Sequence, residues 1–286
     1  MKILLFGSEG TLGNELFKPL SKKFDVTCVD FINKKKINNK NFISLDLSKK
    51  LDSNKFKVYN NDVAIILSFY KTIPADFNET DAREFNYINS QILNNALKIC
   101  KISKVKKVIY FSSAAVYSEN YSLKKISEKF KLKPNNIYAK FKINAEKKVS
   151  KFGKQNNIQS IIFRLFNYFT QSGNTLIKNF RKQLNKKEIF VNGNGNQSRD
   201  FLHIGDMLNA IEYFINNRVK SSTFNLCSGN GTKIKDIINA LIKKGNIINY
   251  TNKNQSNFFL VGNNKKLKKL MNWKIQKNFN KFIQKL

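Results

Sequence analysis

Residues 2–13 read KILLFGSEGTLG, an apolar run that leads directly into closely spaced glycines. The apolar run predicts a buried β-strand, and the glycines predict a tight turn that opens a helix. Such a turn lets a pyrophosphate approach backbone N–H groups at the N-terminus of a helix. The cofactor-binding residues expected in this turn are Gly7, Gly10, Thr11, Leu12 and Gly13.

The same alternation of apolar runs and helical patterns continues to about residue 165. Strands are expected at residues 2–6, 26–29, 42–45, 63–67, 108–112 and 160–164, and helices at 12–21, 85–100 and 138–152. Strands that alternate with helices pair in parallel, with helices on both faces of the sheet. The expected fold class is α/β: a doubly wound parallel Rossmann sheet over residues 1–165. A smaller C-terminal α/β lobe that binds substrate follows over 166–286, with some elements crossing between the two.

Asp30 ends the second expected strand. A carboxylate at this place accepts hydrogen bonds from ribose hydroxyls and repels a 2′-phosphate, so NAD is favoured over NADP as the cofactor. Lys34, Lys35 and Lys36 follow directly and would accommodate a phosphate if they lay close to it.

The chain is strongly basic, with 52 Lys and Arg against 19 Asp and Glu and a formal net charge of +33. Such a balance is typical of proteins that bind nucleic acid or anionic membranes. The lysines are spread along the whole sequence, however, and Lys, Asn, Ile and Phe, all abundant here, share AT-rich codons. We therefore expect a solvated basic surface and no nucleic-acid partner.

Other features restrict the class further. No apolar run reaches the roughly 18–20 residues of a membrane helix, and the one after Met1 is too short for a signal peptide, so we expect a cytoplasmic protein without membrane insertion. Three scattered cysteines and one histidine give neither a disulfide framework nor a metal site.

A second constellation lies further along the chain. Tyr138 and Lys142 stand four residues apart in an expected helix, and therefore on one face of it. An ammonium beside a phenol stabilises the phenolate and lowers its pKa, which suits a general acid or base. Ser113 ends the strand in VIYFSSAAVY (residues 108–117), where its hydroxyl would orient a substrate oxygen and share a proton with Tyr138. The predicted catalytic residues are Ser113, Tyr138 and Lys142.

Together, the glycine-rich turn, the SSAAVY strand end and the Tyr-Lys helix resemble the extended short-chain dehydrogenase/reductase family, and more narrowly its NAD-dependent sugar-nucleotide epimerase/dehydratase type. Residues 193–206, GNGNQSRDFLHIGD, are similar to a signature of that family. The resemblance implies further cofactor contacts from Asp46, Leu47, Lys71 and Asn86, and substrate contacts from Asn167, Thr175, Leu176 and Arg199. Arg199 would grip a diphosphate.

Departures from the family pattern bear on the reaction. Dehydratases of this type place an acid one or two positions after the catalytic Ser or Thr, where this chain has Ala114 and Ala115. Residues 68–70, Ser-Phe-Tyr, are bulkier than is usual and are expected to narrow the nicotinamide pocket.

Glu146 is expected to be a surface or helix-pairing charge. His203, Phe166, Phe201 and Trp273 are expected in the core, and Tyr117 in packing or at the substrate.

The resemblance implies an NAD-dependent epimerase acting at C4 of a nucleotide-diphosphate hexose through a 4-keto intermediate. An NAD(P)H-dependent reductase of a 4-keto-6-deoxy sugar nucleotide would use the same residues in one direction. A non-catalytic, dinucleotide-binding regulatory protein is the alternative from another class. The expected partners are a nucleotide-diphosphate sugar and, on the resemblance alone, a second copy of the chain in a homodimer.

Overall fold

The computed structural model describes residues 1–32, 41–51, 60–70, 79–117, 122–171, 175–184, 186, 188–242, 246–251 and 258–285. The chain forms two compact units. The first comprises residues 1–116, 134–163 and 217–223, and the second comprises 117–133, 164–216 and 224–286. The chain thus crosses between the units several times, and the single boundary after residue 165 stays a prediction.

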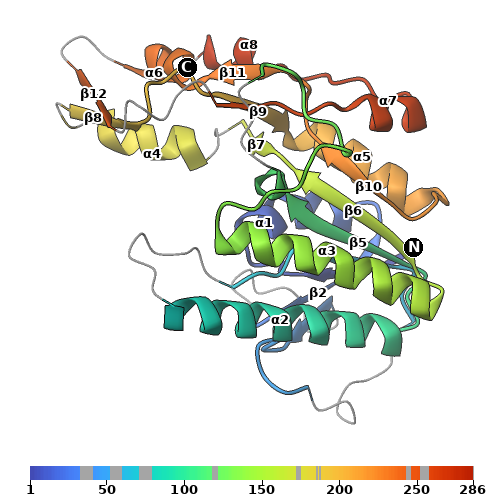
Figure 1. Cartoon of the computed structure of the whole chain (residues 1–286). Helices are drawn as coiled ribbons and strands as arrows, with labels where there is room; N and C mark the ends of the chain where they lie inside the picture. Colours follow the sequence, from blue (N-terminus) through green and yellow to red (C-terminus); the bar gives the residue numbers. More distant parts are fainter. Residues whose placement is uncertain are drawn as a thin grey trace. The chain divides into compact units, whose positions relative to one another are not determined.

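The centre of the first unit is a seven-stranded sheet with the order β10-β6-β5-β4-β1-β2-β3 (Figure 1). Strands β1 and β2, β1 and β4, β2 and β3, and β4 and β5 pair in parallel. The predicted doubly wound α/β fold is confirmed. The strands are β1 (Lys2–Phe6), β2 (Asp25–Asp30), β3 (Phe42–Ser44), β4 (Val63–Ile66), β5 (Lys107–Ser113), β6 (Gln159–Leu165) and β10 (Ser222–Leu226).

Helices cover both faces of this sheet because alternate side chains of each strand point to opposite faces. Leu4 and Phe6 belong to the core beneath α2 (Glu79–Ile102) and α3 (Ile137–Asn156). Helix α1 (Thr11–Ser21) contacts β1 and β2. All three helices lie where the sequence predicts them, although α2 begins six residues earlier, at Glu79 rather than Phe85.

The second unit contains a four-stranded sheet and a two-stranded one. Its strands are β7 (Asn167–Phe169), β8 (Glu188–Asn192), β9 (Ser198–His203), β11 (Gly231–Lys233), β12 (Ile247–Thr251) and β13 (Phe259–Leu260). Its helices are α4 (Thr175–Leu184), α5 (Ile204–Asn216), α6 (Ile234–Leu241), α7 (Lys265–Met271) and α8 (Phe279–Ile283). Phe166, Phe201 and Trp273 are buried, as predicted.

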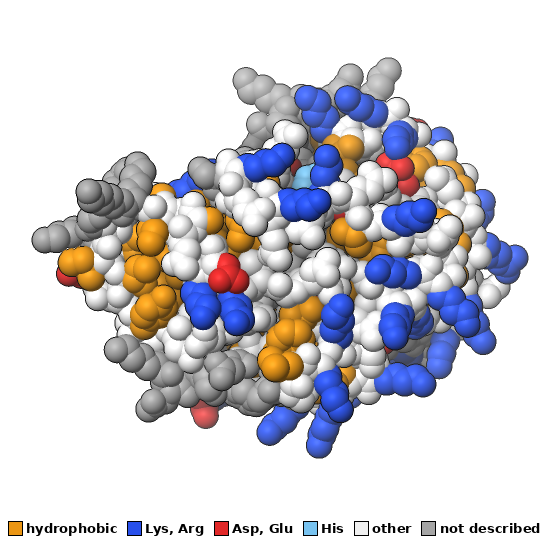
Figure 2. Space-filling view, turned by 90° about the horizontal axis from the view of Figure 1, so that it is seen from above, with side chains coloured by type: hydrophobic (Ala, Val, Ile, Leu, Met, Phe, Trp, Pro, Cys, Tyr) orange, Lys and Arg blue, Asp and Glu red, His pale blue; other side chains and the backbone are white. Residues whose placement is uncertain are grey.

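Positive charge is spread over the face of the described residues that Figure 2 shows. Figure 2 shows Lys and Arg side chains dispersed between uncharged and hydrophobic groups over one face, rather than gathered into one stripe. Among the residues that the structure describes, no helix combines the length and the apolar character needed to cross a bilayer.

Candidate active site

The predicted glycine turn joins β1 to α1 through two close backbone approaches. Gly7 has φ +82°, in the left-handed region that favours glycine, and its N–H donates to the carbonyl of Val29 at 3.0 Å. A Cβ on Gly13 would lie 2.1 Å from the carbonyl oxygen of Gly7. Both positions therefore require glycine to hold the turn against the helix.

The need for glycine at position 10 cannot come from the protein's own packing, unlike at Gly7 and Gly13. Gly10 precedes α1 with an ordinary φ of −70°, and the nearest atom to a Cβ added there would be the Gly7 oxygen at 3.4 Å, an ordinary contact. The protein itself would tolerate a side chain at this exposed position. The bare backbone at the N-terminus of α1 instead fits an approaching pyrophosphate, because N–H groups and the helix dipole attract anions there.

Asp30 is fixed at the end of β2 by hydrogen bonds to both of its carboxylate oxygens. Oδ2 accepts the N–H of Glu9, within the glycine turn, at 2.8 Å, and Oδ1 accepts the N–H of Phe31 at 2.8 Å. The carboxylate thus lies against the loop that would hold a pyrophosphate, as the prediction of a ribose contact requires. Lys34, Lys35 and Lys36 fall outside the described residues.

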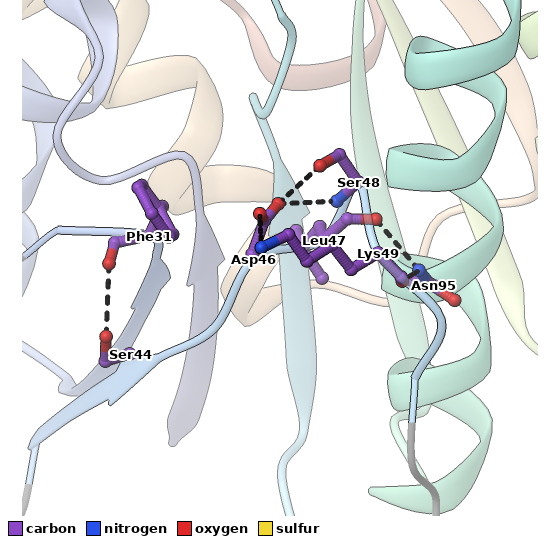
Figure 3. Close-up of polar contacts among 7 residues, drawn as sticks. All are labelled: Phe31, Ser44, Asp46, Leu47, Ser48, Lys49 and Asn95. Carbon is purple, nitrogen blue, oxygen red and sulfur yellow. Dashed lines mark hydrogen bonds and ion pairs between the residues drawn. The ribbon is translucent and has the colours of Figure 1, made fainter.

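Asp46 and Leu47 follow β3; Asp46 makes its contacts through its carboxylate and Leu47 through its backbone carbonyl (Figure 3). Asp46 accepts from the backbone N–H of Ser48 at 2.9 Å and from its hydroxyl at 2.6 Å, and lies 3.7 Å from the ammonium of Lys49. Burial raises the pKa of Asp46, but these contacts outweigh it, and the pKa lies below its ordinary value. Leu47 is buried, and its carbonyl accepts from Asn95 of α2 at 2.8 Å.

The segment after β4 is bound to α2 through an asparagine that the sequence analysis missed. Asn89 is 1% exposed, accepts the N–H of Tyr70 at 2.9 Å and donates to the Tyr70 carbonyl at 3.2 Å. Asn86, one turn earlier, is exposed, so its cofactor contact stays a prediction. The helical period could have distinguished them, because Asn89 continues the buried face that begins at Phe85. Lys71 lies outside the described residues.

The structure brings the three predicted catalytic residues together. Ser113 ends β5, and its hydroxyl accepts the N–H of Ala115 at 3.2 Å. It also lies close enough to Tyr138 of α3 to affect the pKa of that phenol. The Lys142 ammonium lies 5.7 Å from the centroid of the Tyr138 ring. It donates to the Phe111 carbonyl at 2.9 Å and to the Tyr110 hydroxyl at 3.2 Å.

Burial dominates the protonation of this pair. It raises the pKa of Tyr138, a rise that the hydrogen bond to Ser113 only partly opposes. This direction is opposite to the one expected from the neighbouring ammonium alone. Burial also lowers the pKa of Lys142 to about 7, although the carboxylate of Glu146 opposes that shift. Whether Lys142 is charged at neutral pH therefore depends on its surroundings.

Glu146 is not the surface charge that the sequence suggested. It is 6% exposed, and the hydroxyl of Ser112 on β5 donates to its Oε1 at 2.6 Å. A residue four positions after Lys142 lies on the same helical face, so the spacing alone could have identified it.

Phe69, from the bulky segment after β4, packs directly on Tyr138 and Lys142, the predicted catalytic pair. Its ring meets that of Tyr138 edge-on, with centroids 5.1 Å apart and planes at 86°, and its centroid lies 5.0 Å from the Lys142 ammonium. It also packs against Phe85 and Phe141. The ring thus supports Tyr138 and covers Lys142.

The predicted substrate residues lie in the second unit. Asn167 on β7 is exposed and donates to the carbonyl of Asp200 at 3.3 Å, while Arg199 on the paired strand β9 stacks on Phe258, its Cζ 4.7 Å from the ring centroid. Burial lowers the pKa of Arg199 to about 10, so it keeps its charge at neutral pH. Leu176 on α4 packs against the core of this unit, and Thr175 begins the same helix.

Asp200 and Tyr117 hold this unit together. The buried Asp200 carboxylate accepts hydrogen bonds from the N–H groups of Ser228, Gly229 and Gly262 and from the Ser228 hydroxyl. Tyr117 is buried and donates to Asn225 at 2.5 Å, which favours packing over substrate contact. The half-buried His203 accepts the N–H of Gly205 at 3.0 Å.

Residues 3–227 match the profile of the NAD dependent epimerase/dehydratase family. The chain belongs to this family. It is 29% identical over 259 residues to the ADP-L-glycero-D-manno-heptose-6-epimerase of Brachyspira hyodysenteriae, covering 84% of this chain and 80% of the relative. It is 29% identical over 253 residues to the dTDP-D-glucose 4,6-dehydratase of Dictyostelium discoideum, which covers 79% of this chain and 58% of that longer relative.

Among solved structures, the UDP-glucuronic acid 4-epimerase of Bacillus cereus, in complex with UDP-glucuronic acid and NAD, has a TM-score of 0.83 at 21% identity. The match covers 99% of this chain and 97% of that one. Membership in the NAD dependent epimerase/dehydratase family confirms the predicted cofactor, NAD. The bare backbone at Gly10 and the fixed carboxylate of Asp30 fit that cofactor and would hold its pyrophosphate and its ribose, respectively.

Proposed function

We propose that the chain is an NAD-dependent nucleotide-sugar epimerase that inverts C4 of a nucleotide-diphosphate hexose. The observation that carries the proposal is the grouping of three side chains: the buried ammonium of Lys142 lies 5.7 Å from the ring centroid of Tyr138, and Ser113 lies close enough to Tyr138 to affect its pKa. These groups provide a proton carrier, a hydroxyl that orients the substrate oxygen and a cation that stabilises the phenolate. Relatives of the same family include epimerases.

In the proposed reaction, Tyr138 removes the proton of the C4 hydroxyl while the C4–H bond breaks with its electron pair and a C4 carbonyl forms. NAD, when bound, accepts that hydride and returns it. Ser113 keeps its hydrogen bond to the carbonyl oxygen. After the 4-keto sugar turns over, the hydride adds to its other face and Tyr138 returns the proton. The epimer has the same composition as the substrate, so no external oxidant is consumed.

Two alanines argue against dehydration. Ala114 and Ala115 form a short 3-10 turn, η3 (Ala114–Val116), directly after Ser113. Elimination of water needs an acid or base beyond Tyr138, and an alanine cannot carry a proton. The similarity to a dehydratase therefore supports the family but not that reaction.

Substrate binding is part of the proposal. Arg199 would grip the diphosphate of the sugar nucleotide, because its planar guanidinium matches phosphate oxygens bidentately and keeps its charge. Asn167, Thr175 and Leu176 would contact the rest of the nucleotide sugar. A homodimer in the cytoplasm completes the proposal, on the resemblance to the family alone.

The test is to denature the purified protein, identify the dinucleotide that is released and compare its amount with the protein. NAD at one equivalent, together with interconversion of C4 epimers in a panel of nucleotide sugars, supports the epimerase, whose cofactor is restored in each turnover. A protein that carries no dinucleotide as purified, and that binds and releases NADH or NADPH reversibly, indicates the 4-keto sugar reductase.

Absence of any dinucleotide binding would contradict both enzymes, whereas dinucleotide binding without turnover of any sugar nucleotide would favour the regulatory alternative. A DNA mobility shift that persists at about 150 mM salt would support that alternative further, because nonspecific electrostatic attraction weakens with salt.

A further inference from the structure

Four polar side chains meet in the buried layer between β5 and α3. Tyr110 and Ser112 point to the same face of β5 because they are two residues apart, and Lys142 and Glu146 share a face of α3 because they are one turn apart. Lys142 donates to Tyr110 at 3.2 Å, and Ser112 donates to Glu146 at 2.6 Å. Each of the four residues is at most 6% exposed, so water screens the charges of Lys142 and Glu146 very little.

We propose that Glu146 is a positioning residue of the Tyr138–Lys142 pair: Ser112 holds its carboxylate in the buried layer between β5 and α3, on the same helical face as Lys142, where its negative charge keeps the buried ammonium protonated. The inference rests on the proposed function for its effect on turnover. The electrostatic coupling between Glu146 and Lys142 is a separate property of the fold and is measurable without substrate.

The surroundings of Lys142 explain why a counter-charge matters. Its ammonium lies 4.9, 5.0 and 5.7 Å from the ring centroids of Tyr110, Phe69 and Tyr138, and both of its hydrogen-bond acceptors are neutral. Removing an ammonium from water favours its uncharged form. Among the described residues, the titratable groups that face it are Tyr110 from β5 and Tyr138 and Glu146 from its own helix. The segment after β4 contributes only Phe69.

Glu146 is the one carboxyl group among these, and it raises the pKa of Lys142 against the larger effect of burial. The consequence reaches Tyr138, because burial already disfavours its phenolate. An uncharged Lys142 would leave that phenolate without a cation to stabilise it. Glu146 would thus support proton removal without touching the substrate.

A purely structural role for Glu146, as the acceptor of the Ser112 hydrogen bond, makes a different prediction. Glu146→Gln keeps an acceptor oxygen for Ser112 and removes the charge. Glu84→Gln is the matched control, since it removes one negative charge from an exposed position on α2. The double variant Ser112→Ala/Glu146→Leu removes the charge and both hydrogen-bond partners. This double variant replaces Glu146→Gln if the single variant does not fold, because replacing both hydrogen-bond partners by apolar groups costs little stability.

The first measurement is the free energy of unfolding between pH 5.5 and 9. The pKa of Lys142 is lower in the folded than in the unfolded chain, so the unfolded chain binds more protons above about pH 7 and this residue makes stability rise with pH there. Without the Glu146 charge the pKa of Lys142 should fall further, so the free energy of unfolding should begin to rise at a pH about one unit lower. Lys142→Met should remove this contribution, and Glu84→Gln should leave it unchanged. A rise that begins at the wild-type pH in both Glu146 variants would overturn the inference.

The second measurement is turnover against pH, with NAD binding recorded in parallel. Glu146→Gln should bind NAD normally, lose kcat rather than raise KM, and lose activity at a lower pH than the wild type on the alkaline side. A wild-type pH profile would contradict the role in turnover. If the stability curve shifts but even the wild type shows no turnover, the proposed function fails and the coupling between Glu146 and Lys142 stands.

Discussion

Oδ2 of Asp30 accepts the backbone N–H of Glu9 at 2.8 Å, which joins the carboxyl end of β2 to the glycine turn after β1. One carboxylate therefore fixes the loop that would receive the pyrophosphate, and it is also the group that we expect to contact the ribose. We therefore expect cofactor selectivity and the shape of the turn to be linked through this side chain.

Asp30→Ala should shift the preference from NAD toward NADP, because it removes both the ribose acceptor and the charge that repels a 2′-phosphate. We expect NAD to bind about 10- to 100-fold more weakly, as for the loss of a charged hydrogen bond. Dissociation constants for both cofactors measure the effect. Asp30→Asn, which keeps an acceptor oxygen for Glu9, separates the charge from the shape of the turn, and Asp25→Asn at the start of β2 is the control. Unchanged selectivity in both Asp30 variants would assign the choice to Lys34, Lys35 and Lys36.

The fold could be predicted from the sequence because its strands are nearly all apolar and its turns carry glycine. Residues 2–6 were expected as a strand and form β1, and Asp30 ends β2 as expected. The candidate catalytic residues could be proposed for a similar reason, since Ser113 ends a strand and Tyr138 and Lys142 share a helical spacing. These features are local in the chain.

What the sequence analysis missed depends on contacts between elements. Glu146 has the charge of a surface residue; its spacing from Lys142 indicates the buried face of the helix, but its partner there, Ser112, lies 34 residues earlier in the chain. Asn89 binds Tyr70 across the space between α2 and the end of β4, a contact that no short pattern encodes. The direction of the Tyr138 pKa was also mistaken, because the degree of burial is a property of the packed chain.

Two glycines of the same turn should respond oppositely to alanine. Gly13→Ala should lower the free energy of unfolding by about 1–3 kcal/mol or more, because its Cβ would overlap the Gly7 carbonyl. Gly10→Ala should fold with nearly wild-type stability, since within the protein its Cβ would make only an ordinary contact with the Gly7 oxygen, and it should bind NAD more weakly because the Cβ would obstruct the pyrophosphate. Urea unfolding and NAD titration of both variants make the comparison. A destabilised Gly10→Ala that still binds NAD normally would contradict the assignment of the bare backbone to the pyrophosphate.

Tyr138→Phe should abolish turnover while leaving the fold and NAD binding intact. The phenyl ring keeps the edge-on contact with Phe69, and only the proton carrier is lost. Loss of a general acid or base lowers kcat by about 10²- to 10⁴-fold. Tyr87→Phe, at an exposed position on α2, removes the same hydroxyl without effect. If Tyr138→Phe retained more than a few per cent of the activity, another group would carry the proton.

Phe69→Ala tests whether the bulky ring after β4 supports Tyr138 or merely narrows the pocket. The half-buried ring packs on Tyr138, Phe85 and Phe141, so its loss should lower the free energy of unfolding by about 2–3 kcal/mol, below the cost of a fully buried Phe. A less firmly held Tyr138 should lower kcat more than it raises KM. Tyr70→Ala, at the exposed neighbouring position, should change stability by no more than about 0.5 kcal/mol. If Phe69→Ala instead bound NAD more tightly and turned over faster, the ring would obstruct the cofactor rather than support the catalytic tyrosine.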